Sequence, residues 1–454
     1  MSLQNSKNIN LILNATVPFT LYKLALPNVF AVFMYSVVTF SEAWYIGQIS
    51  IDELASLALV FPFVSLIGMM GLGAIGGGIT SSLSRAIGKN DKDLANKVVW
   101  HSLLLMLFLS LIFLVIFVLL SNKIFNIIGA EENVINRSVM FCKIFFSCAP
   151  VMFFLFLLVS IFRGCGAYQN LAKITIFTNI SQVLLSGFLT LGWSVFPQLG
   201  LLGIAISTIF CHGLSSIYMF TYIIRNNLNV SFKFYSFEKN IIYDILRVGG
   251  VSAINSICIT LTMIVITFFI SKYGTSAIAG HGICLRLEQM LIPLAFGVGG
   301  VLTTIVGVNF GAKNYGRAKK FALTGAVIIG LIGSIIGVFV AIFPSLWINI
   351  FTEDKEAYAI AAVYLMIVGP VFGIFAGGKT LYFASMGTGK MLIPISAAIT
   401  RLFIVLCFGM IVSYFSLDIK FLFLGVALGL SVIGIILYVN LFKKGWNPVY
   451  ISRK

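Results

Sequence analysis

The chain has 454 residues, of which 59% are hydrophobic and only 10% charged, and its formal net charge is +16. Soluble domains carry roughly 25% charged and about 45–50% apolar residues, so this composition excludes a water-soluble globular protein. Apolar runs recur along the whole chain, each long enough to cross a bilayer as a helix of about 20 residues, and because they do not alternate with polar residues they exclude a β-barrel.

Twelve apolar segments predict twelve transmembrane helices. Inside lipid every backbone polar group must find a partner within the chain, and a helix provides that partner within one segment. We therefore predict an all-α integral membrane protein. In chain order the predicted spans are 17–46, 54–79, 98–120, 138–161, 171–193, 201–223, 247–270, 277–304, 322–343, 358–383, 392–414 and 420–442.

Basic residues gather in alternate connections between these spans. Acidic residues such as Asp52, Glu131 and Asp354 occupy the intervening connections. Because Lys and Arg mark cytoplasmic loops, we predict a multi-pass protein of the plasma (inner) membrane with both termini in the cytoplasm. The net positive charge is then a topology signal and indicates no nucleic-acid partner. The basic connections hold Arg85, Lys89, Lys92, Lys97, Arg163, Lys173, Arg225, Lys233, Lys239, Arg247, Lys313, Arg317, Lys319 and Lys320, and the tail holds Lys443, Lys444, Arg453 and Lys454.

The sequence aligns with itself at an offset of 223 residues, which relates Thr80 to Thr303 and Gly164-x-Gly166 to Gly387-x-Gly389. Each repeat holds six spans, so both halves enter the membrane from the same side. We predict two pseudo-symmetric six-helix lobes related as parallel repeats. The predicted division is an N-terminal lobe at 1–224, a cytoplasmic linker at 225–246, and a C-terminal lobe with a cytoplasmic tail at 247–454. Because one chain contains both lobes, a second chain is not needed, and we predict a monomer.

The sequence shows no signature of an enzyme, a metal site or an ATP-driven pump. It contains no GxxxxGK[ST] phosphate-binding loop, and no nucleophile, base or metal ligands cluster in the loops. The seven cysteines are scattered through apolar runs without metal-binding or disulfide spacing. Two lobes favour a secondary transporter with its substrate between them over a bare scaffold or a passive channel. We therefore predict no catalytic residue, no metal and no cofactor besides a coupling ion.

Glu42 is the most informative residue of the first predicted lobe. It lies in the outer part of the first span, and an ionisable group inside the bilayer is costly and so indicates function. A carboxylate there exchanges a proton or holds a monovalent cation. We predict a cation-coupling site made of Glu42 with Asn179 and Gln182 of the fifth span; the alternative is an interfacial acid near the span end. Pro27, inside the first span, is a hinge candidate because it removes a backbone hydrogen bond.

A second group of polar residues lies in spans of the second predicted lobe. Glu288 stands two residues from Arg286, so a neutralising local pair is an alternative to a binding role. Lys379 either repels cations or pairs with an acid whose cation site is unoccupied. Interhelical hydrogen bonds explain Asn255 and His281 as well as a ligand does. All five remain candidates for substrate binding or for a second-lobe site.

Several segments together resemble the MATE (multidrug and toxic compound extrusion) family. A proline-containing first helix, an acid before an outer glycine and matching basic loops in both halves are similar to family motifs. The order of these motifs at the repeat offset carries the resemblance, which covers essentially the whole chain. The segments are Leu24-Ala25-Leu26-Pro27, Glu42-Ala43-Trp44-Tyr45-Ile46-Gly47, Ser84-Arg85-Ala86-Ile87-Gly88-Lys89, Arg163-Gly164-x-Gly166, Arg286-Leu287-Glu288-Gln289, and Val308-Asn309-Phe310-Gly311-Ala312 followed by Arg317-Ala318.

This resemblance implies a twelve-helix antiporter that exports small organic, often cationic and amphipathic compounds in exchange for H⁺ or Na⁺ by alternating access. Glu42 takes the place of the family's first-helix aspartate. The fifth-helix acid is absent, with Val183 near its place, and Lys379 lies near the place of the tenth-helix acid. The resemblance therefore implies ion coupling in the first lobe. A flippase for a lipid-linked or amphipathic substrate, within the same superfamily, is the alternative function.

Overall fold

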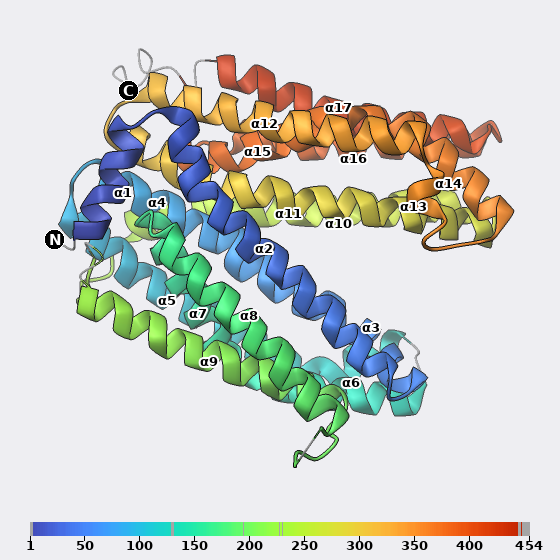
Figure 1. The fold of residues 1–454 in the computed structure, drawn as a ribbon, viewed down its shortest axis with the longest axis horizontal. Coiled ribbons are helices and arrows are strands. Elements are labelled where there is room, and N and C mark those ends of the chain that lie inside the picture. Colours follow the sequence, from blue (N-terminus) through green and yellow to red (C-terminus); the bar gives the residue numbers. More distant parts are fainter. Residues whose placement is uncertain are drawn as a thin grey trace. The chain divides into compact units, whose positions relative to one another are not determined.

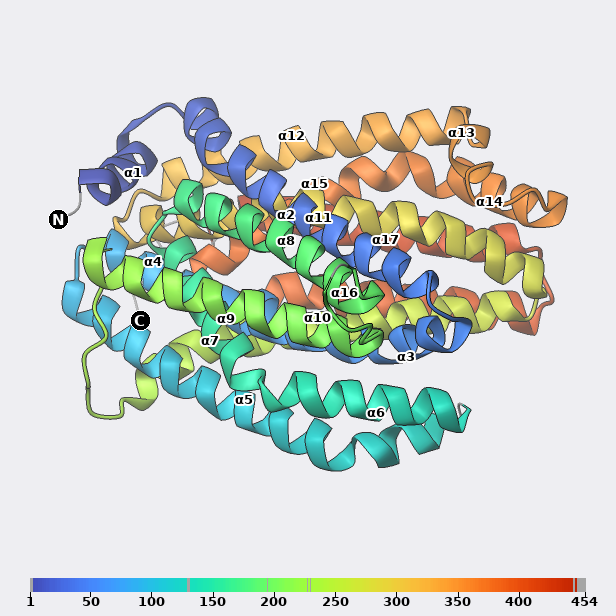
Figure 2. The ribbon, with the colours of Figure 1, turned by 60° about the horizontal axis from the view of Figure 1, so that its bottom comes forward.

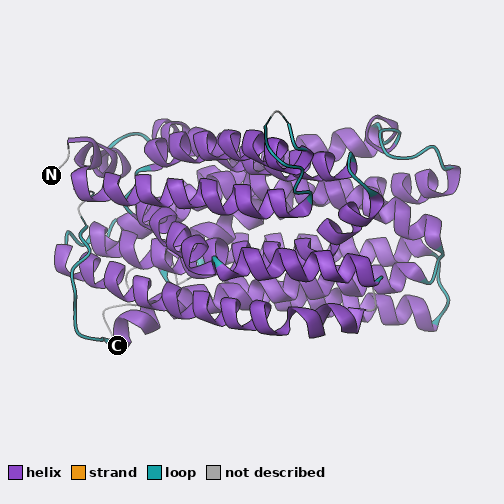
Figure 3. Cartoon of the chain, turned by 90° about the horizontal axis from the view of Figure 1, so that it is seen from below, coloured by secondary structure: helices purple, strands orange, loops and turns teal. Residues whose placement is uncertain are grey.

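The structure is a computed structural model that describes residues 3–128, 131–193, 195–226, 228, 230–443 and 446, without the side chains of 3–7 and 127–128. Every regular element within these ranges is a helix (Figure 3). Three residues of the predicted basic tail, Lys444, Arg453 and Lys454, lie outside the described residues.

The chain divides into two compact units. The first comprises Met1–Leu11 and Phe30–Gly249, and the second comprises Ile12–Val29 and Gly250–Lys454. Three helices have residues in both units: α1 (Leu3–Asn14), α2 (Val17–Gly47) and α10 (Lys239–Ser271). The predicted lobe boundaries at 224 and 247 stay a prediction, although α10 begins earlier than the predicted span at 247.

The remaining helices lie within one unit each (Figure 1). In the first unit they are α3 (Ile51–Gly68), the π-helix η1 (Met69–Ile75), α4 (Gly76–Gly88), α5 (Lys92–Ile128), α6 (Glu132–Ser147), α7 (Ala149–Gly164), α8 (Tyr168–Leu191) and α9 (Leu201–Asn226). In the second unit they are α11 (Thr275–Gly311), α12 (Tyr315–Ile342), α13 (Ser345–Ile348), α14 (Lys355–Val368), the 3₁₀ turn η2 (Gly369–Val371), α15 (Phe372–Thr388), α16 (Leu392–Tyr414) and α17 (Ile419–Phe442).

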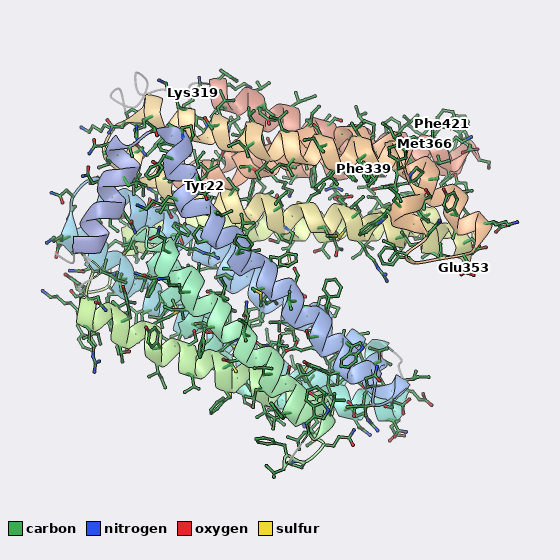
Figure 4. All side chains as sticks on the ribbon, in the orientation of Figure 1. Tyr22, Lys319, Phe339, Glu353, Met366 and Phe421 are labelled. Atoms are coloured by element: carbon green, nitrogen blue, oxygen red, sulfur yellow. The ribbon has the colours of Figure 1, made fainter. Side chains whose placement is uncertain are left out.

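These helices confirm the predicted all-α membrane fold. Within the described ranges, eleven helical segments are long and apolar enough to cross a membrane, and the bent pair α6–α7 makes a twelfth when taken as one span. That pair bends by 53° at Cys148. Exposed apolar side chains cover the outer helix faces, as contact with lipid requires; Phe339, Met366 and Phe421 are labelled examples (Figure 4).

Polar residues of the connections predicted to lie outside the cell cap the helices that follow them. The Ser50 hydroxyl accepts a hydrogen bond from the Glu53 amide at the start of α3. The Asp354 carboxylate accepts one from the Ala357 amide at the start of α14. Such side chains satisfy backbone N–H groups that the first turn leaves unpaired, so part of the acidic loop pattern has a structural cause.

Equivalent contacts in the two units support the internal repeat. In the first unit the Thr80 hydroxyl donates to the Ser160 carbonyl (3.2 Å), and in the second the Thr303 hydroxyl donates to the Phe383 carbonyl (2.7 Å). Each of these four residues is related to its counterpart by the predicted offset. The two-lobe, parallel-repeat architecture is therefore consistent with the fold.

The repeated Gly-x-Gly motif has the same backbone geometry in both units. Gly166 has φ +72° and Gly389 has φ +75°, a region that residues with a Cβ rarely adopt. The first glycine of each motif allows a close helix approach instead. A Cβ at Gly164 would lie 2.8 Å from the Leu83 side chain, and one at Gly387 would meet the Thr303 carbonyl.

Helices α8 and α9 are packing neighbours in the first unit. In Figure 2, as in Figure 1, α8 and α9 run side by side in the first unit. This pairing matters for the site, because α8 carries Asn179 and Gln182 and α9 carries Thr208.

Candidate functional site

The predicted first-lobe site is centred on a contact between α2 and α8. The Gln182 amide Nε2 donates to Glu42 Oε1 at 2.9 Å and also to the Thr208 hydroxyl at 2.8 Å. Gln182 and Thr208 are buried, whereas Glu42 is partly buried. The side chain of Gln182 is thereby fixed between α2 and α9 and presents an N–H donor to the carboxylate.

Asn179 lies one helical turn before Gln182 and on the same face of α8, since residues three apart are neighbours on a helix. It is only 4% exposed, and its Nδ2 has no hydrogen-bond partner among the described residues. Buried amide groups are nearly always paired. The unpaired Nδ2 of Asn179 is therefore an exception among buried amides, and the role of Asn179 in the predicted site stays a prediction.

Aromatic rings pack beside this site. Tyr45, one turn after Glu42 on α2, packs edge to face against Trp193 with ring centroids 5.8 Å apart. Both rings lie over Gly187 of α8, where a Cβ would come within 3.0 Å of the Tyr45 ring. The thiol of Cys211 on α9 lies within electrostatic range of Glu42. Among the described residues, the Glu42 carboxylate thus interacts with an amide, a thiol and a tyrosine, and with no basic side chain.

The second-lobe candidates lie around a buried ion pair. Arg401 of α16 donates from Nη2 to Glu288 Oε1 of α11 at 3.1 Å. The Tyr364 hydroxyl of α14 donates to Glu288 Oε2 at 3.3 Å. Glu288 is 1% exposed and Arg401 3% exposed. Sequence analysis named neither Arg401 nor Tyr364 as a site residue; Tyr364 gave no signal, because it resembles any other membrane tyrosine.

Lys379 of α15 lies among aromatic rings beside this pair. Its ammonium is 5.6 Å from the Phe375 ring centroid and 5.8 Å from that of Tyr382, distances at which a cation is attracted to a ring face. It is 6% exposed and within electrostatic range of Arg401 and Glu288. Tyr382 in turn interacts with Asn255 of α10, so Asn255 joins the same region of the second unit.

His281 and Arg286, both on α11, differ in their surroundings. The His281 ring packs edge to face on Tyr364 at 5.5 Å, and its Nε2 has no partner among the residues described. Arg286 is exposed and lies 5.0 Å from the Phe351 ring. The partner of Glu288 is therefore Arg401, and the alternative of a local pair with Arg286 is wrong: residues two apart on a helix do not face each other.

Pro27 lies inside α2, two residues before the chain passes from the second unit to the first after Val29. The neighbouring Asn28 amide donates to the Gly297 carbonyl of α11 at 2.7 Å within the second unit. The hinge role of Pro27 stays a prediction.

A further ion network, which sequence analysis did not predict, lies at the start of α10. Asp244 pairs with Arg85 of α4 at 2.6 Å and with Arg247 at 2.5 Å, and it accepts a hydrogen bond from the Ser82 hydroxyl at 2.6 Å. The basic motif around Arg85 thus has a structural partner. In the described part of the chain, no three His, Cys, Asp or Glu side chains gather as a metal site would require.

Comparisons with known proteins identify the family. The MatE family model matches residues 27–187 and 252–415. The probable multidrug resistance protein YoeA of Bacillus subtilis is 24% identical over 351 residues, covering 76% of each chain, and the FAD transporter of Shewanella oneidensis is 23% identical over 387 residues, covering 83% of this chain and 85% of that one. A solved MOP superfamily transporter from Pyrococcus furiosus, 19% identical, superposes with a TM-score of 0.87 over 96% of this chain and 97% of its own. The chain therefore belongs to the MatE family.

Proposed function

We propose that this protein is a secondary active antiporter that exports small organic cations in exchange for H⁺ or Na⁺ by alternating access. The observation that carries the proposal is the hydrogen bond between Gln182 and the membrane-embedded Glu42. Family membership and relatives named as multidrug resistance proteins support the export of drug-like compounds.

The proposed coupling step is an exchange of partners at Glu42. Without a bound cation, the carboxylate is stabilised by the Gln182 N–H donor, because hydrogen bonding favours the charged form of an acid. When a proton or Na⁺ binds Glu42, it replaces the Gln182 N–H as the main group that offsets the negative charge of the carboxylate. Because Gln182 is also held by Thr208, its amide stays in place to receive the carboxylate again after the cation leaves.

The same residues suggest why the substrate is an organic cation. The surroundings of Glu42 hold aromatic rings, Tyr45 and Trp193, and no basic group among their described contacts. Aromatic faces and a carboxylate attract flat or quaternary cations. A substrate and a coupling cation would then compete for one negative charge, which by itself links export of one to entry of the other.

An organic anion is a second candidate substrate. Lys379 and Arg401 outnumber Glu288 in the buried part of the second unit, and one relative is named an FAD transporter. A flippase for an amphipathic or lipid-linked substrate is the third possibility within the fold. The transport assay below separates these candidates by the substrate supplied.

We further propose that the protein lies in the plasma (inner) membrane with its basic connections and both termini in the cytoplasm, as the charge distribution favours. It would act as a monomer, without nucleic acid and without a cofactor besides the coupling ion, since each chain contains both repeats.

The test is transport in liposomes. Purified protein is reconstituted, and a fluorescent organic cation is followed under an H⁺ gradient, an Na⁺ gradient or neither. We expect gradient-driven export by the wild type, loss of gradient dependence in Glu42→Gln, and wild-type behaviour in Glu356→Gln, which alters an exposed acid.

Each other result has a defined meaning. Full coupled transport by Glu42→Gln would leave an exporter but remove Glu42 from the coupling site. Failure of the wild type to move any cation, with uptake of FAD or lipid in parallel vesicles, would replace the cation proposal by the corresponding alternative.

A further inference from the structure

Both oxygens of the Glu288 carboxylate accept a hydrogen bond from the protein. Arg401 contacts one oxygen at 3.1 Å and the Tyr364 hydroxyl contacts the other at 3.3 Å. These partners come from three different helices, α11, α14 and α16. Each carboxylate oxygen therefore already has a donor from the protein, and the compensating positive charge is supplied by the chain itself.

The second unit is built to hold the Arg401 side chain at this place. Its stem lies against α17 at Gly429, where an added Cβ would be 3.1 Å from Arg401 Cγ. Its guanidinium lies 5.7 Å from the Phe375 ring centroid. A glycine that leaves room for the stem and a ring that covers the planar group show that the arginine is packed in position and does not reach toward a membrane surface.

A second positive group makes the region unfavourable for a further cation. The Lys379 ammonium is within electrostatic range of both Arg401 and Glu288, so two basic groups face one acid in a buried environment. Like charges repel strongly in a surrounding of low dielectric constant. An incoming Na⁺ or H⁺ would have to displace Arg401 from Glu288 against this repulsion.

We propose that Arg401 is a built-in cation that permanently occupies the carboxylate site of the second lobe, so that Glu288 exchanges no ion and the protein couples through Glu42 alone. The proposal rests on the antiport function proposed above. It has two consequences: removing the guanidinium creates a new ion-binding carboxylate, and each transport cycle of the wild type moves one coupling cation.

The first consequence is tested by thermal stability in detergent. Wild type, Arg401→Met and the double variant Glu288→Gln/Arg401→Met are melted in NaCl and in choline chloride of equal ionic strength, at low and neutral pH. All three keep Glu42, and all keep the other titratable groups that face the pair, Tyr364, Lys379, His281 and Cys284.

We expect Arg401→Met alone to gain an upward shift of Tm with Na⁺ or with acid, because its unpaired Glu288 binds the added cation. Wild type and the double variant should show only the smaller, shared response of Glu42. Equal ion responses in all three proteins would overturn the proposal, as would a wild type whose ion response is lost in the double variant. If Arg401→Met does not fold, the comparison of the wild type with the double variant decides by itself.

The second consequence is tested in liposomes with an imposed K⁺ diffusion potential. Exchange of one coupling cation for one monovalent organic cation moves no net charge, so the initial rate of the wild type should not change with membrane potential. The neutral double variant should behave the same. Arg401→Met should become potential-dependent, because a second cation then moves. A potential-dependent wild type that loses this dependence in the double variant would overturn the proposal.

The two assays separate this inference from the function on which it rests. If the protein moves no organic cation, the transport proposal fails, while the ion-dependent Tm of Arg401→Met still tests whether the guanidinium fills a carboxylate site. If transport is coupled through Glu42 but the double variant loses coupling, the function stands and the built-in cation is wrong.

Discussion

Each unit carries a buried or half-buried carboxylate on a membrane helix, Glu42 in the first and Glu288 in the second, and the two are compensated differently. Glu42 in the first unit accepts a hydrogen bond from a neutral donor, the Gln182 amide, at 2.9 Å. Glu288 in the second faces a guanidinium at 3.1 Å and a tyrosine hydroxyl. A neutral donor leaves the negative charge available to a mobile cation, whereas a guanidinium neutralises it. The same repeat can therefore provide an exchangeable site in one half and a fixed pair in the other.

Helix packing in the two units differs in a parallel way. In the first unit α5 and α7 meet through rings, with Phe113 and Phe153 centroids 5.5 Å apart. The repeat-related pair in the second unit, α12 and α15 with the adjoining turn η2, meets through glycines such as Gly337 and Gly373. Glycine lets helix backbones approach closely. In this helix pair the second unit thus relies on close backbone contact, and the first unit on side-chain packing.

The largest effect should come from breaking the buried pair. Arg401→Met leaves Glu288 without its cation, and removal of one partner of a buried ion pair costs about 3–5 kcal/mol. We expect this loss in the free energy of unfolding in detergent under ion-free conditions at neutral pH. The double variant Glu288→Gln/Arg401→Met should recover most of it. A single variant as stable as the wild type would show that the pair is not buried as described.

A smaller effect is expected at Glu42, where the change concerns the affinity for the coupling cation and not the stability of the fold. Gln182→Leu removes the donor to Glu42, and a hydrogen bond to a charged group contributes about 1.5–3 kcal/mol, or roughly 10- to 100-fold in an equilibrium constant. The ion-free carboxylate loses this stabilisation, so the half-saturating concentration of the coupling cation should fall by that factor while its release slows.

The control for this prediction is Thr208→Val, which removes the other partner of Gln182 but keeps the donor to Glu42. Its half-saturating concentration should stay close to that of the wild type. An unchanged value in Gln182→Leu, measured as transport rate against ion concentration, would mean that Gln182 does not compensate the empty carboxylate.

The glycine contacts of the second unit predict a third effect on stability. A Cβ at Gly337 would overlap the Gly369 carbonyl, so Gly337→Ala must push α12 away from η2. Overpacking of this kind costs about 1–3 kcal/mol. Gly282→Ala on α11 is the matched control, because its Cβ would meet nothing within 4 Å. It should be neutral or more stable by up to about 1 kcal/mol through helix propensity. Equal Tm values for the two variants would contradict the close approach.

The sequence predicted the fold well because its signals are local or periodic. Continuous apolar runs predicted each span, and the repeat offset related Thr80 to Thr303, whose hydrogen bonds prove equivalent. The bend at Cys148 was not predicted, although Pro150 in the first turn of α7 is a sequence signal for a helix break just before it.

The candidate sites were predicted only in part. Glu42 and Gln182 stood out as polar residues inside apolar spans, and the structure brings them together. The partner of Glu288 was not predicted, because 113 residues separate it from Arg401. Contacts between distant helices depend on which helix faces meet, and a single sequence carries no direct signal of that. Arg286 seemed the nearer partner in sequence but points elsewhere.

The smallest expected effect concerns Asn179 and sharpens the comparison within the first site. Its Nδ2 has no partner among the described residues, so Asn179→Leu removes no hydrogen bond of that group and should leave Tm unchanged or slightly higher. If Na⁺ is the coupling ion, the amide oxygen is a suitable ligand for it, and the half-saturating Na⁺ concentration should rise, by up to about tenfold for the loss of one contact. That direction is opposite to the one expected for Gln182→Leu.

If H⁺ is the coupling ion, Asn179→Leu should leave the dependence on pH unchanged, because a proton on Glu42 needs no second oxygen. Transport by this variant over a range of Na⁺ and of pH therefore identifies the ion as well as the role of the residue.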